Sequence, residues 1–320
     1  MRRIINKGTV GKASSGNKQS KFASRLKRIE KQQAVHDIEF ETKVSAATTC
    51  FEESISALFG MPGIGKSKFA EEMGFALQEK YGLDQSGAYF IQCERINHSW
   101  NIRKTMCPTW PTFRAFVDKM EKSPELVKTV KMWVIDTIDA LAPLGISTIC
   151  HDMGIADLRE ATRKVGGDGW FAEAWQELRF ELEYQILRLA SFGPGVLILS
   201  HERDRKRVEN NREVEKASMD LSNSIYNSIG DACSMILHMR VVNDVTRKAK
   251  SRPIRCLSFL SSESEEAKDN LNVLLKKYPD GAMRFTTERE AVDNLLGCFG
   301  KQKSVAKRHK KVRKTVRRKR

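Results

Sequence analysis

The stretch GMPGIGKS, residues 60–67, follows the short apolar run SISALF and precedes a helical pattern that stops at Gly82. It meets the pattern GxxxxGK[ST], in which two spaced glycines are followed by a lysine and a hydroxyl side chain. The glycines allow the backbone to wrap closely around phosphate oxygens. Successive N–H groups and the helix N-terminus then face the anion. Because the motif lies between a strand and a helix, the context that confirms it, we expect a phosphate-binding loop here.

The side chains of this loop indicate which phosphate they bind. We expect Lys66 to reach the β- and γ-phosphates and the Ser67 hydroxyl to bind Mg²⁺, so ATP and Mg²⁺ are the expected cofactors. The residues predicted to contact the nucleotide are Gly60, Met61, Pro62, Gly63, Ile64, Gly65, Lys66, Ser67 and Lys68.

A second part of the site is predicted by MWVIDT, residues 132–137, where an apolar strand delivers Asp136 at its carboxyl end. Ligands of α/β sheets bind at this edge, and an acid there can hold Mg²⁺ together with the loop hydroxyl. We therefore predict Ser67 and Asp136 as metal ligands. Thr137 and Asp139 follow closely. Asp139 either holds other residues of the site in place without touching the ligand or caps the next helix, and the sequence leaves both interpretations open.

Two further strand ends carry polar side chains. Glu94 ends the strand AYFIQCE and is the best candidate for the base that orients an attacking water, although a solvated loop acid is the plain alternative. Ser200 and His201 end the strand GVLILSH, where they are candidates for contact with the γ-phosphate. The predicted catalytic set is Lys66, Glu94, Asp136 and His201.

Apolar strands that alternate with helices predict an α/β fold with a mostly parallel sheet covered by helices on both faces. The segments favouring further strands are 87–93, 130–141, 193–201, 233–241 and 254–260. Helices are expected over 110–122, 169–193 and 286–299, the last capped by Thr286 or Thr287.

The net charge of +16 is concentrated at the two ends of the chain. Residues 1–32 hold ten Lys or Arg and one Glu, and residues 301–320 hold twelve Lys or Arg and no acid. The remaining 34 basic and 39 acidic residues give the middle a net charge of −5. Both tails are too poor in apolar side chains to fold alone, and we expect them to be disordered. They are also candidates for sequence-independent binding to nucleic acid phosphates, with a targeting address as the alternative.

Composition excludes several classes of protein. No apolar run reaches the roughly 18 residues of a membrane span, and the N-terminal segment has no apolar core of a secretory signal. The seven cysteines are scattered and form no CxxC pair, which disfavours a disulfide framework or a zinc ribbon. A reducing, cytoplasmic location is therefore expected.

The motifs GMPGIGKS, FIQCE, TWPTFRAFVDKM, WVIDTIDAL, GWFAEAWQEL and GVLILSHERDRKRVE occur in an order that resembles the phage RecA-like P-loop ATPases, an AAA-type family of nucleotide-binding proteins. The resemblance covers about residues 54–260. It implies a RecA-like P-loop NTPase core, ATP and Mg²⁺ as cofactors, and a role in DNA recombination or replication. It also implies Glu94 as the water-activating glutamate and His201 as the γ-phosphate sensor. On this basis we divide the chain into a basic arm (1–42), the core (43–262), a helical extension (263–300) and a basic tail (301–320).

The resemblance implies DNA as a partner, single-stranded by expectation, together with a single-strand annealing or binding protein, in the cytoplasm of a host cell. The segment 202–220 corresponds to a DNA-facing loop, but its charges alternate in sign, so that a solvated surface explains it equally well. Homo-oligomers are expected, with an arginine finger drawn from Arg203, Arg205, Arg207 or Arg212. Two alternatives stay open: a non-catalytic protein switched by nucleotide, and a small-molecule kinase whose lid is HERDRKR.

Overall fold

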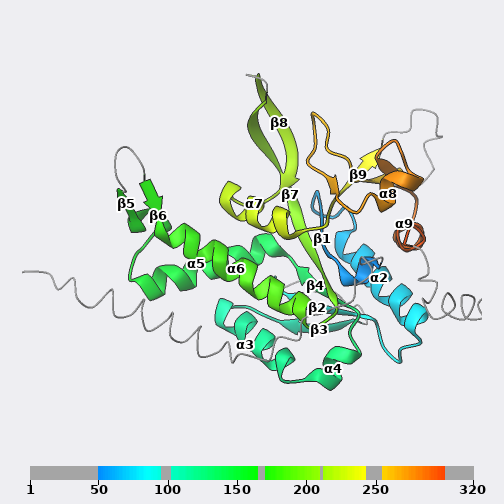
Figure 1. The fold of residues 1–320 in the computed structure, drawn as a ribbon, viewed down its shortest axis with the longest axis horizontal. Coiled ribbons are helices and arrows are strands. Elements are labelled where there is room, and N and C mark those ends of the chain that lie inside the picture. The colour runs from blue at the N-terminus through cyan, green and yellow to red at the C-terminus, as the bar shows by residue number, and fades with distance from the viewer. Residues whose placement is uncertain (1–49, 95–101, 165–169, 210–211, 243–253, 300–320) are drawn as a thin grey trace, which may run out of the picture. The chain divides into compact units, whose positions relative to one another are not determined.

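The computed structural model describes residues 50–299 except 95–101, 165–169, 210–211 and 243–253. The arm predicted at 1–42 and the tail predicted at 301–320 therefore lie outside the described residues. The described part is built on a ten-stranded sheet with the order β12-β10-β9-β1-β7-β4-β2-β3, with β11 paired to β9 and β8 paired to β7 (Figure 1).

The strands of this sheet are β1 (Ile55–Gly60), β2 (Ala88–Gln92), β3 (Arg103–Met106), β4 (Met132–Asp136), β7 (Gly195–Glu209), β8 (Arg212–Met219), β9 (Met235–Val242), β10 (Ile254–Ser258), β11 (Lys268–Asp269) and β12 (Ala282–Phe285). A separate two-stranded sheet pairs β5 (Thr162–Lys164) with β6 (Trp170–Ala172). The helices are η1 (Phe51–Glu53), α2 (Lys66–Tyr81), α3 (Trp110–Glu121), α4 (Pro124–Lys128), α5 (Ile138–Met153), η2 (Leu158–Ala161), α6 (Glu173–Ser191), α7 (Asn223–Ala232), α8 (Val273–Lys277) and α9 (Glu288–Leu296).

The predicted mostly parallel sheet with helices on both faces is confirmed. Strands β9, β1, β7, β4, β2 and β3 run parallel to one another, whereas β10 and β11 are antiparallel to β9 and β8 is antiparallel to β7. Successive residues of β4 belong to different cores. Trp133 is part of the core that includes residues of α3, α5 and α6, and Val134 is part of the core that includes residues of α2 and α9. A strand buried on both faces must be apolar throughout, which is why these segments read as continuous apolar runs. Among the described helices, none has the length and apolar character needed to cross a bilayer.

The segment 202–220 differs from the predicted loop, because it is a β-hairpin. Strand β7 runs past His201 to Glu209, and β8 pairs with it antiparallel from Glu202↔Met219 to Glu209↔Arg212. The hairpin projects beyond the main body of the sheet (Figure 1). Alternating charged residues suit such a ribbon, whose two faces are both accessible to water at its outer end.

The segment 263–300 is not purely helical, in contrast to the predicted helical extension. Besides α8 and α9 it contributes β11, which pairs with β9, and β12, which pairs with β10 at the edge of the sheet. Thr287, one of the two expected caps, is the N-cap of α9, and its side chain accepts a hydrogen bond from the Glu290 backbone N–H. Helix α9 packs on α2, the helix that begins at Lys66.

Candidate functional site

The predicted site residues come from strand ends that lie side by side at one edge of the sheet. Strand β7 lies between β1 and β4, and His201 is in register with Gly60 at the end of β1. Strand β2 borders β4 on its other side, with Gln92 in register with Asp136. Because all four strands are parallel, their carboxyl ends meet at the same edge.

The two glycines of the motif serve different structural needs. Gly60 lies against β9, where a Cβ would come within 2.4 Å of the Met239 carbonyl oxygen. Gly65 has a φ of 111°, in the left-handed region that side chains disfavour. It immediately precedes α2, whose first N–H groups have no partner within the helix and are free to bind an anion.

Lys66 is buried at the base of the loop. Its Nζ donates hydrogen bonds to the Gly60 carbonyl at 2.7 Å and the Met61 carbonyl at 3.0 Å. Burial lowers the pKa of Lys66, and the nearby carboxylates of Asp139 and Asp136 partly oppose this effect. The ammonium group is thus held next to the phosphate loop and close to the acids of the neighbouring strands.

Asp136 and Ser67 are brought together as predicted. The Ser67 hydroxyl donates to Asp136 Oδ1 at 3.3 Å. Asp136 is only 1% exposed, and its Oδ2 has no hydrogen-bond partner among the described residues. Burial raises the pKa of Asp136 to about 6, and the nearby Glu94 carboxylate adds to the effect. A buried carboxylate oxygen without a partner beside a hydroxyl is a donor set that fits a hard cation such as Mg²⁺.

Glu94 lies beside Asp136 across the pair β2 and β4. The Thr137 hydroxyl donates a hydrogen bond of 2.7 Å to Glu94 Oε1. Thr137 directly follows Asp136, so one short segment both carries the buried acid and orients the neighbouring glutamate. This contact gives Glu94 a fixed position at the site rather than that of a solvated loop acid.

His201 is oriented by Asp139, which decides between the two interpretations of that acid. Asp139 accepts hydrogen bonds from the His201 backbone N–H at 2.9 Å and from Nδ1 at 2.6 Å. The N-cap of α5 is Thr137, so Asp139 supports the site and does not cap the helix. With the Nδ1 proton shared with Asp139, Nε2 remains for another contact. Glu94, Asp139 and His201 each place one potential ligand atom within 4.8 Å of the others.

Ser200 does not join this group, in contrast to the expectation from its strand end. It is fully buried, and its hydroxyl donates to the His201 carbonyl at 3.0 Å and accepts from the Asp220 N–H at 3.2 Å. These contacts hold the base of the hairpin together.

Two residues outside the predicted set, Arg255 and Glu288, lie on the phosphate loop. Arg255 of β10 donates to the Ile64 carbonyl at 2.9 Å and forms an ion pair with Glu288 at the start of α9. Arg255 and Ile64 are 191 residues apart in the chain. No local pattern marks such a pair, because its members meet only when β10 and α9 have joined the sheet.

A sequence model of the AAA domain family matches residues 53–271, more than two thirds of the chain. The chain belongs to the AAA domain family. No curated protein matches it. The matched part of this AAA domain includes the phosphate loop, Glu94, Asp136 and His201, and it ends before β12 and α9. The family is one of nucleotide-binding ATPases, in agreement with the P-loop fold.

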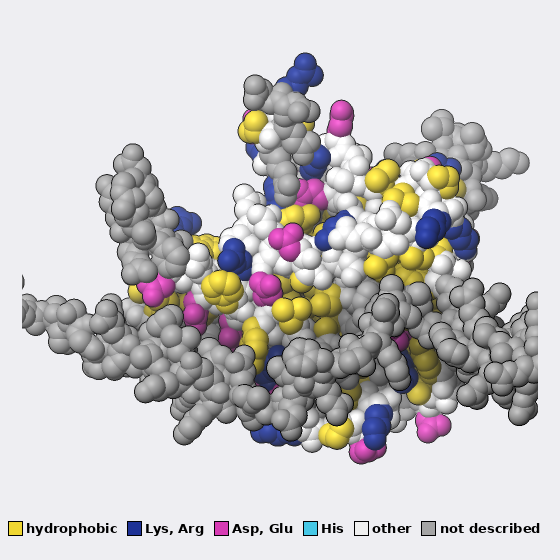
Figure 2. All heavy atoms as spheres, in the orientation of Figure 1, with side chains coloured by type: hydrophobic (Ala, Val, Ile, Leu, Met, Phe, Trp, Pro, Cys, Tyr) yellow, Lys and Arg dark blue, Asp and Glu magenta, His cyan; other side chains and the backbone are white. Residues whose placement is uncertain are grey.

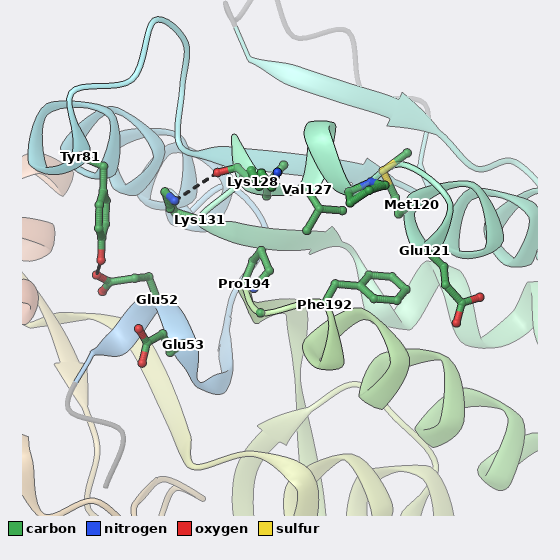
Figure 3. Close-up of a pocket in the computed structure, with 13 residues that line it drawn as sticks. Glu52, Glu53, Tyr81, Met120, Glu121, Val127, Lys128, Lys131, Phe192 and Pro194 are labelled. Carbon is green, nitrogen blue, oxygen red and sulfur yellow. Dashed lines mark hydrogen bonds between the residues drawn. The ribbon is translucent and has the colours of Figure 1, made fainter. Parts of the chain in front are cut away.

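The AAA domain also has a pocket of about 530 Å³ that is unrelated to these residues. Its lining includes Tyr81, Val127, Lys131, Phe192 and Pro194 (Figure 3). Lys131 and Pro194 come just before β4 and β7, so the pocket lies at the amino ends of the strands, opposite the phosphate loop. It is therefore not the nucleotide site.

We expect Asp139→Asn to lower kcat for ATP hydrolysis by about 10- to 100-fold, because small displacements of a reacting group have costs of this size. The amide still accepts from the His201 N–H, but it no longer provides the charge that holds the Nδ1 proton. The measurement is steady-state hydrolysis of ATP, with Asp118→Asn as the control, since Asp118 is 56% exposed and pairs with Arg188 away from the site. An unchanged kcat would show that Asp139 does not contribute to ATP hydrolysis.

Proposed function

We propose that this AAA domain binds ATP with Mg²⁺, hydrolyses it, and couples hydrolysis to an action on DNA in phage recombination or replication. The observation that carries the proposal is the convergence of Lys66, the Ser67–Asp136 pair, Glu94 and His201 at one edge of the sheet. Each group has the chemistry that ATP hydrolysis needs at the corresponding position.

Binding rests on the phosphate loop and on Lys66. The first N–H groups of α2 and the Lys66 ammonium would bind the phosphate oxygens, with Lys66 exchanging its two carbonyl contacts for them. Ser67 and Asp136 would hold Mg²⁺, which neutralises charge on the phosphates when bound. The buried Oδ2 without a partner among the described residues supports Asp136 in this role.

Hydrolysis requires a base for the water and a group that contacts the γ-phosphate. In the proposed step, Glu94 accepts a proton from water while the water oxygen bonds to the γ-phosphorus and the bond to the β,γ-bridging oxygen breaks, giving ADP and phosphate. Thr137 keeps Glu94 oriented through its 2.7 Å hydrogen bond. His201, held by Asp139, would present Nε2 to the γ-phosphate.

The β7–β8 hairpin supports an action on DNA, because its charges separate by face. Directly paired residues of an antiparallel ribbon share a face, and positions two apart in a strand do so too. One face therefore carries the positions of Arg203, Arg205, Arg207, Glu209, Arg212 and Lys216, of which Arg205 and Lys216 are buried. The other carries those of Glu202, Asp204, Lys206, Glu213 and Glu215. The alternation in sequence thus gives one mainly basic and one mainly acidic face. Figure 2 shows Lys and Arg side chains along the hairpin at the top of the view.

The individual arginines of the hairpin differ in their availability. Arg205 is buried, donates to the Leu221 carbonyl at 2.8 Å and lies 4.1 Å from the centre of the Tyr226 ring. It anchors the hairpin to α7 and is a poor candidate for an arginine finger. Arg203 is 57% exposed, and Arg212 is exposed as well. These two are the better candidates for contact with DNA phosphates or with a neighbouring subunit's ATP.

The wider biological role rests on sequence alone. The resemblance to phage RecA-like ATPases supports recombination or replication, a single-strand annealing or binding protein as partner, and assembly into homo-oligomers. The basic tails support additional contact with DNA phosphates through counterion release. A location in the host cytoplasm remains part of this proposal.

We expect Arg212→Glu to weaken DNA binding by about 3- to 10-fold and to reduce the slope of log K against log salt by about 1. Lys206→Glu is a matched control, because it makes the same change of charge on the opposite face of the hairpin. We expect this control to stay within about 2-fold of the unmodified protein, since its 3.4 Å pair with Glu213 is at the surface. The measurement is a salt titration of binding to single-stranded DNA, and equal losses in both variants would contradict a face-specific contact.

The experiment that tests the proposed function is ATP turnover with no DNA, with single-stranded DNA and with double-stranded DNA. We expect hydrolysis that single-stranded DNA stimulates and that Lys66→Ala abolishes. Hydrolysis that no DNA stimulates, together with no binding to DNA at low salt, would refute the link to DNA while leaving the ATPase intact.

A further inference from the structure

Arg255 joins the phosphate loop to the C-terminal part of the fold. Its Nη1 donates to the Ile64 carbonyl at 2.9 Å and to Glu288 Oε1 at 2.5 Å, and its Nη2 donates to the Thr286 carbonyl at 3.4 Å. The guanidinium also lies 5.2 Å from the centre of the Phe285 ring. One side chain therefore contacts the loop, the end of β12 and the start of α9.

The ion pair of Arg255 and Glu288 is well sheltered from water. The two side chains are 15% and 19% exposed. Burial raises the pKa of Glu288, but the hydrogen bond from Arg255 and that from its own backbone N–H outweigh this, so the pKa lies below its ordinary value. Glu288 thus stays ionised at neutral pH and can hold the guanidinium in one orientation.

The pair lies directly on the loop residue that precedes Lys66. A Cβ added to Gly65 would come within 2.6 Å of Glu288 Oε1 and 2.7 Å of Arg255 Nη1. The contact at the Ile64 carbonyl has a further consequence. In a planar trans peptide the C=O and the following N–H point in opposite directions, so a contact that fixes the Ile64 C=O also fixes the Gly65 N–H. N–H groups of such loops are the groups that bind phosphate.

We propose that Arg255 is a positioning residue of the phosphate loop and that Glu288 holds it in place. In the proposed role, Arg255 sets the direction of the Gly65 N–H and so increases the affinity for the phosphates of a nucleoside triphosphate. Glu288 lies beyond residues 53–271, the part matched by the AAA domain family, so the C-terminal segment completes the nucleotide site of this chain. The inference rests on the proposed function, in that the loop must bind a nucleotide.

The test compares Arg255→Met, Arg255→Lys and Glu288→Gln with the unmodified full chain. The probe is a fluorescent ATP analogue titrated with Mg²⁺ present, and KM and kcat for ATP are measured alongside. We expect Arg255→Met to raise Kd and KM about 10-fold and Glu288→Gln to raise them a few-fold, with kcat at saturating ATP within about 2-fold. For Arg255→Lys we expect Kd and KM between those of the unmodified chain and those of Arg255→Met, because an ammonium cannot make the same forked contacts as a guanidinium.

Arg289→Ala is the matched control. Arg289 is on the same helix and links α9 to α2 through Glu79, 2.6 Å away, but it does not contact the loop in any described interaction. We expect its Kd to equal that of the unmodified chain. If Arg289→Ala raises Kd as much as Arg255→Met does, the effect comes from loosening α9, and the proposal is wrong.

Thermal unfolding of each variant separates binding from folding. A variant with a lower melting temperature and an unchanged Kd would overturn the proposal, and so would Arg255→Met with an unchanged Kd. If the unmodified chain binds the analogue no better than Lys66→Ala, the proposed function fails. If it binds and Arg255→Met binds equally well, only the role of Arg255 fails.

Discussion

Replacing Glu94 with glutamine is expected to lower kcat for ATP hydrolysis by about 10²- to 10⁴-fold, the contribution typical of a general base. Glutamine keeps the size of the side chain and can still accept a hydrogen bond from the Thr137 hydroxyl, which lies 2.7 Å from Glu94 Oε1 in the unmodified chain. It cannot accept the proton of the attacking water. We therefore expect the Kd for ATP to change by less than about 3-fold, because Glu94 contributes to the reaction and not to phosphate binding.

Two controls accompany the Glu94→Gln measurement. Glu125→Gln makes the same chemical change at a residue that is 83% exposed and pairs with Lys128, and it should leave kcat unchanged. Thr137→Val removes the hydrogen bond that orients Glu94 and should lower kcat by less than Glu94→Gln does. If Glu94→Gln hydrolyses ATP at the original rate, the nucleotide is better explained as a structural or switching ligand.

Replacing Asp136 with asparagine is expected to have two effects of opposite sign. Mg²⁺-dependent hydrolysis should fall by about 100-fold or more, because a catalytic metal supplies several kcal/mol and each 1.36 kcal/mol is tenfold in rate. The nucleotide-free protein should at the same time become more stable. The reason is that Asp136 is a buried acid whose Oδ2 has no hydrogen-bond partner among the described residues.

The expected gain in stability depends on pH, and its sign follows from the pKa of Asp136. Burial raises that pKa from 3.8 to about 6, so between these values the folded state binds more protons than the unfolded state. The free energy of unfolding therefore falls as the pH rises through this window, by about 3 kcal/mol at most, and stays lower above it. Asp136→Asn should remove this contribution, so that its advantage is largest above pH 6.

The measurement is denaturant unfolding of the unmodified chain and of Asp136→Asn from pH 4 to pH 8, without Mg²⁺ or nucleotide. Asp118→Asn, at an exposed position, serves as the control for a change of charge. If Asp136→Asn is less stable than the unmodified chain at pH 8, the Asp136 carboxylate has partners beyond Ser67. Its burial then does not lower the free energy of unfolding, and the prediction is wrong.

Much of the nucleotide site was predictable because its signals are local. GMPGIGKS places its glycines, lysine and serine within eight residues, and WVID delivers Asp136 at the end of one strand. Strands buried on both faces must be apolar along their length, so the sheet and its helical covering could also be predicted. Glu94 and His201 followed from the rule that parallel strands present their carboxyl ends at one edge.

Other features could not be predicted, because they depend on which segments become neighbours. The alternating charges of 202–220 are uninformative until the segment is known to be a hairpin, since only a period of two separates them by face. The segment 263–300 contains a recognisable amphipathic helix. Its strands β11 and β12 have only two and four residues, too few for a distinct sequence pattern that would predict their pairing with the sheet.

The sequence by itself therefore determined that this chain is an α/β protein with a phosphate loop and with an acid, Asp136, at the carboxyl end of a buried strand. Those properties belong to short stretches whose backbone and side-chain requirements are local. Only the tertiary structure decided that Asp139 holds His201, that Ser200 faces the hairpin, and that Arg255 and Glu288 lie on the loop. These contacts join residues from 20 to 191 positions apart, and a pair so separated becomes neighbours only through the order and register of the strands.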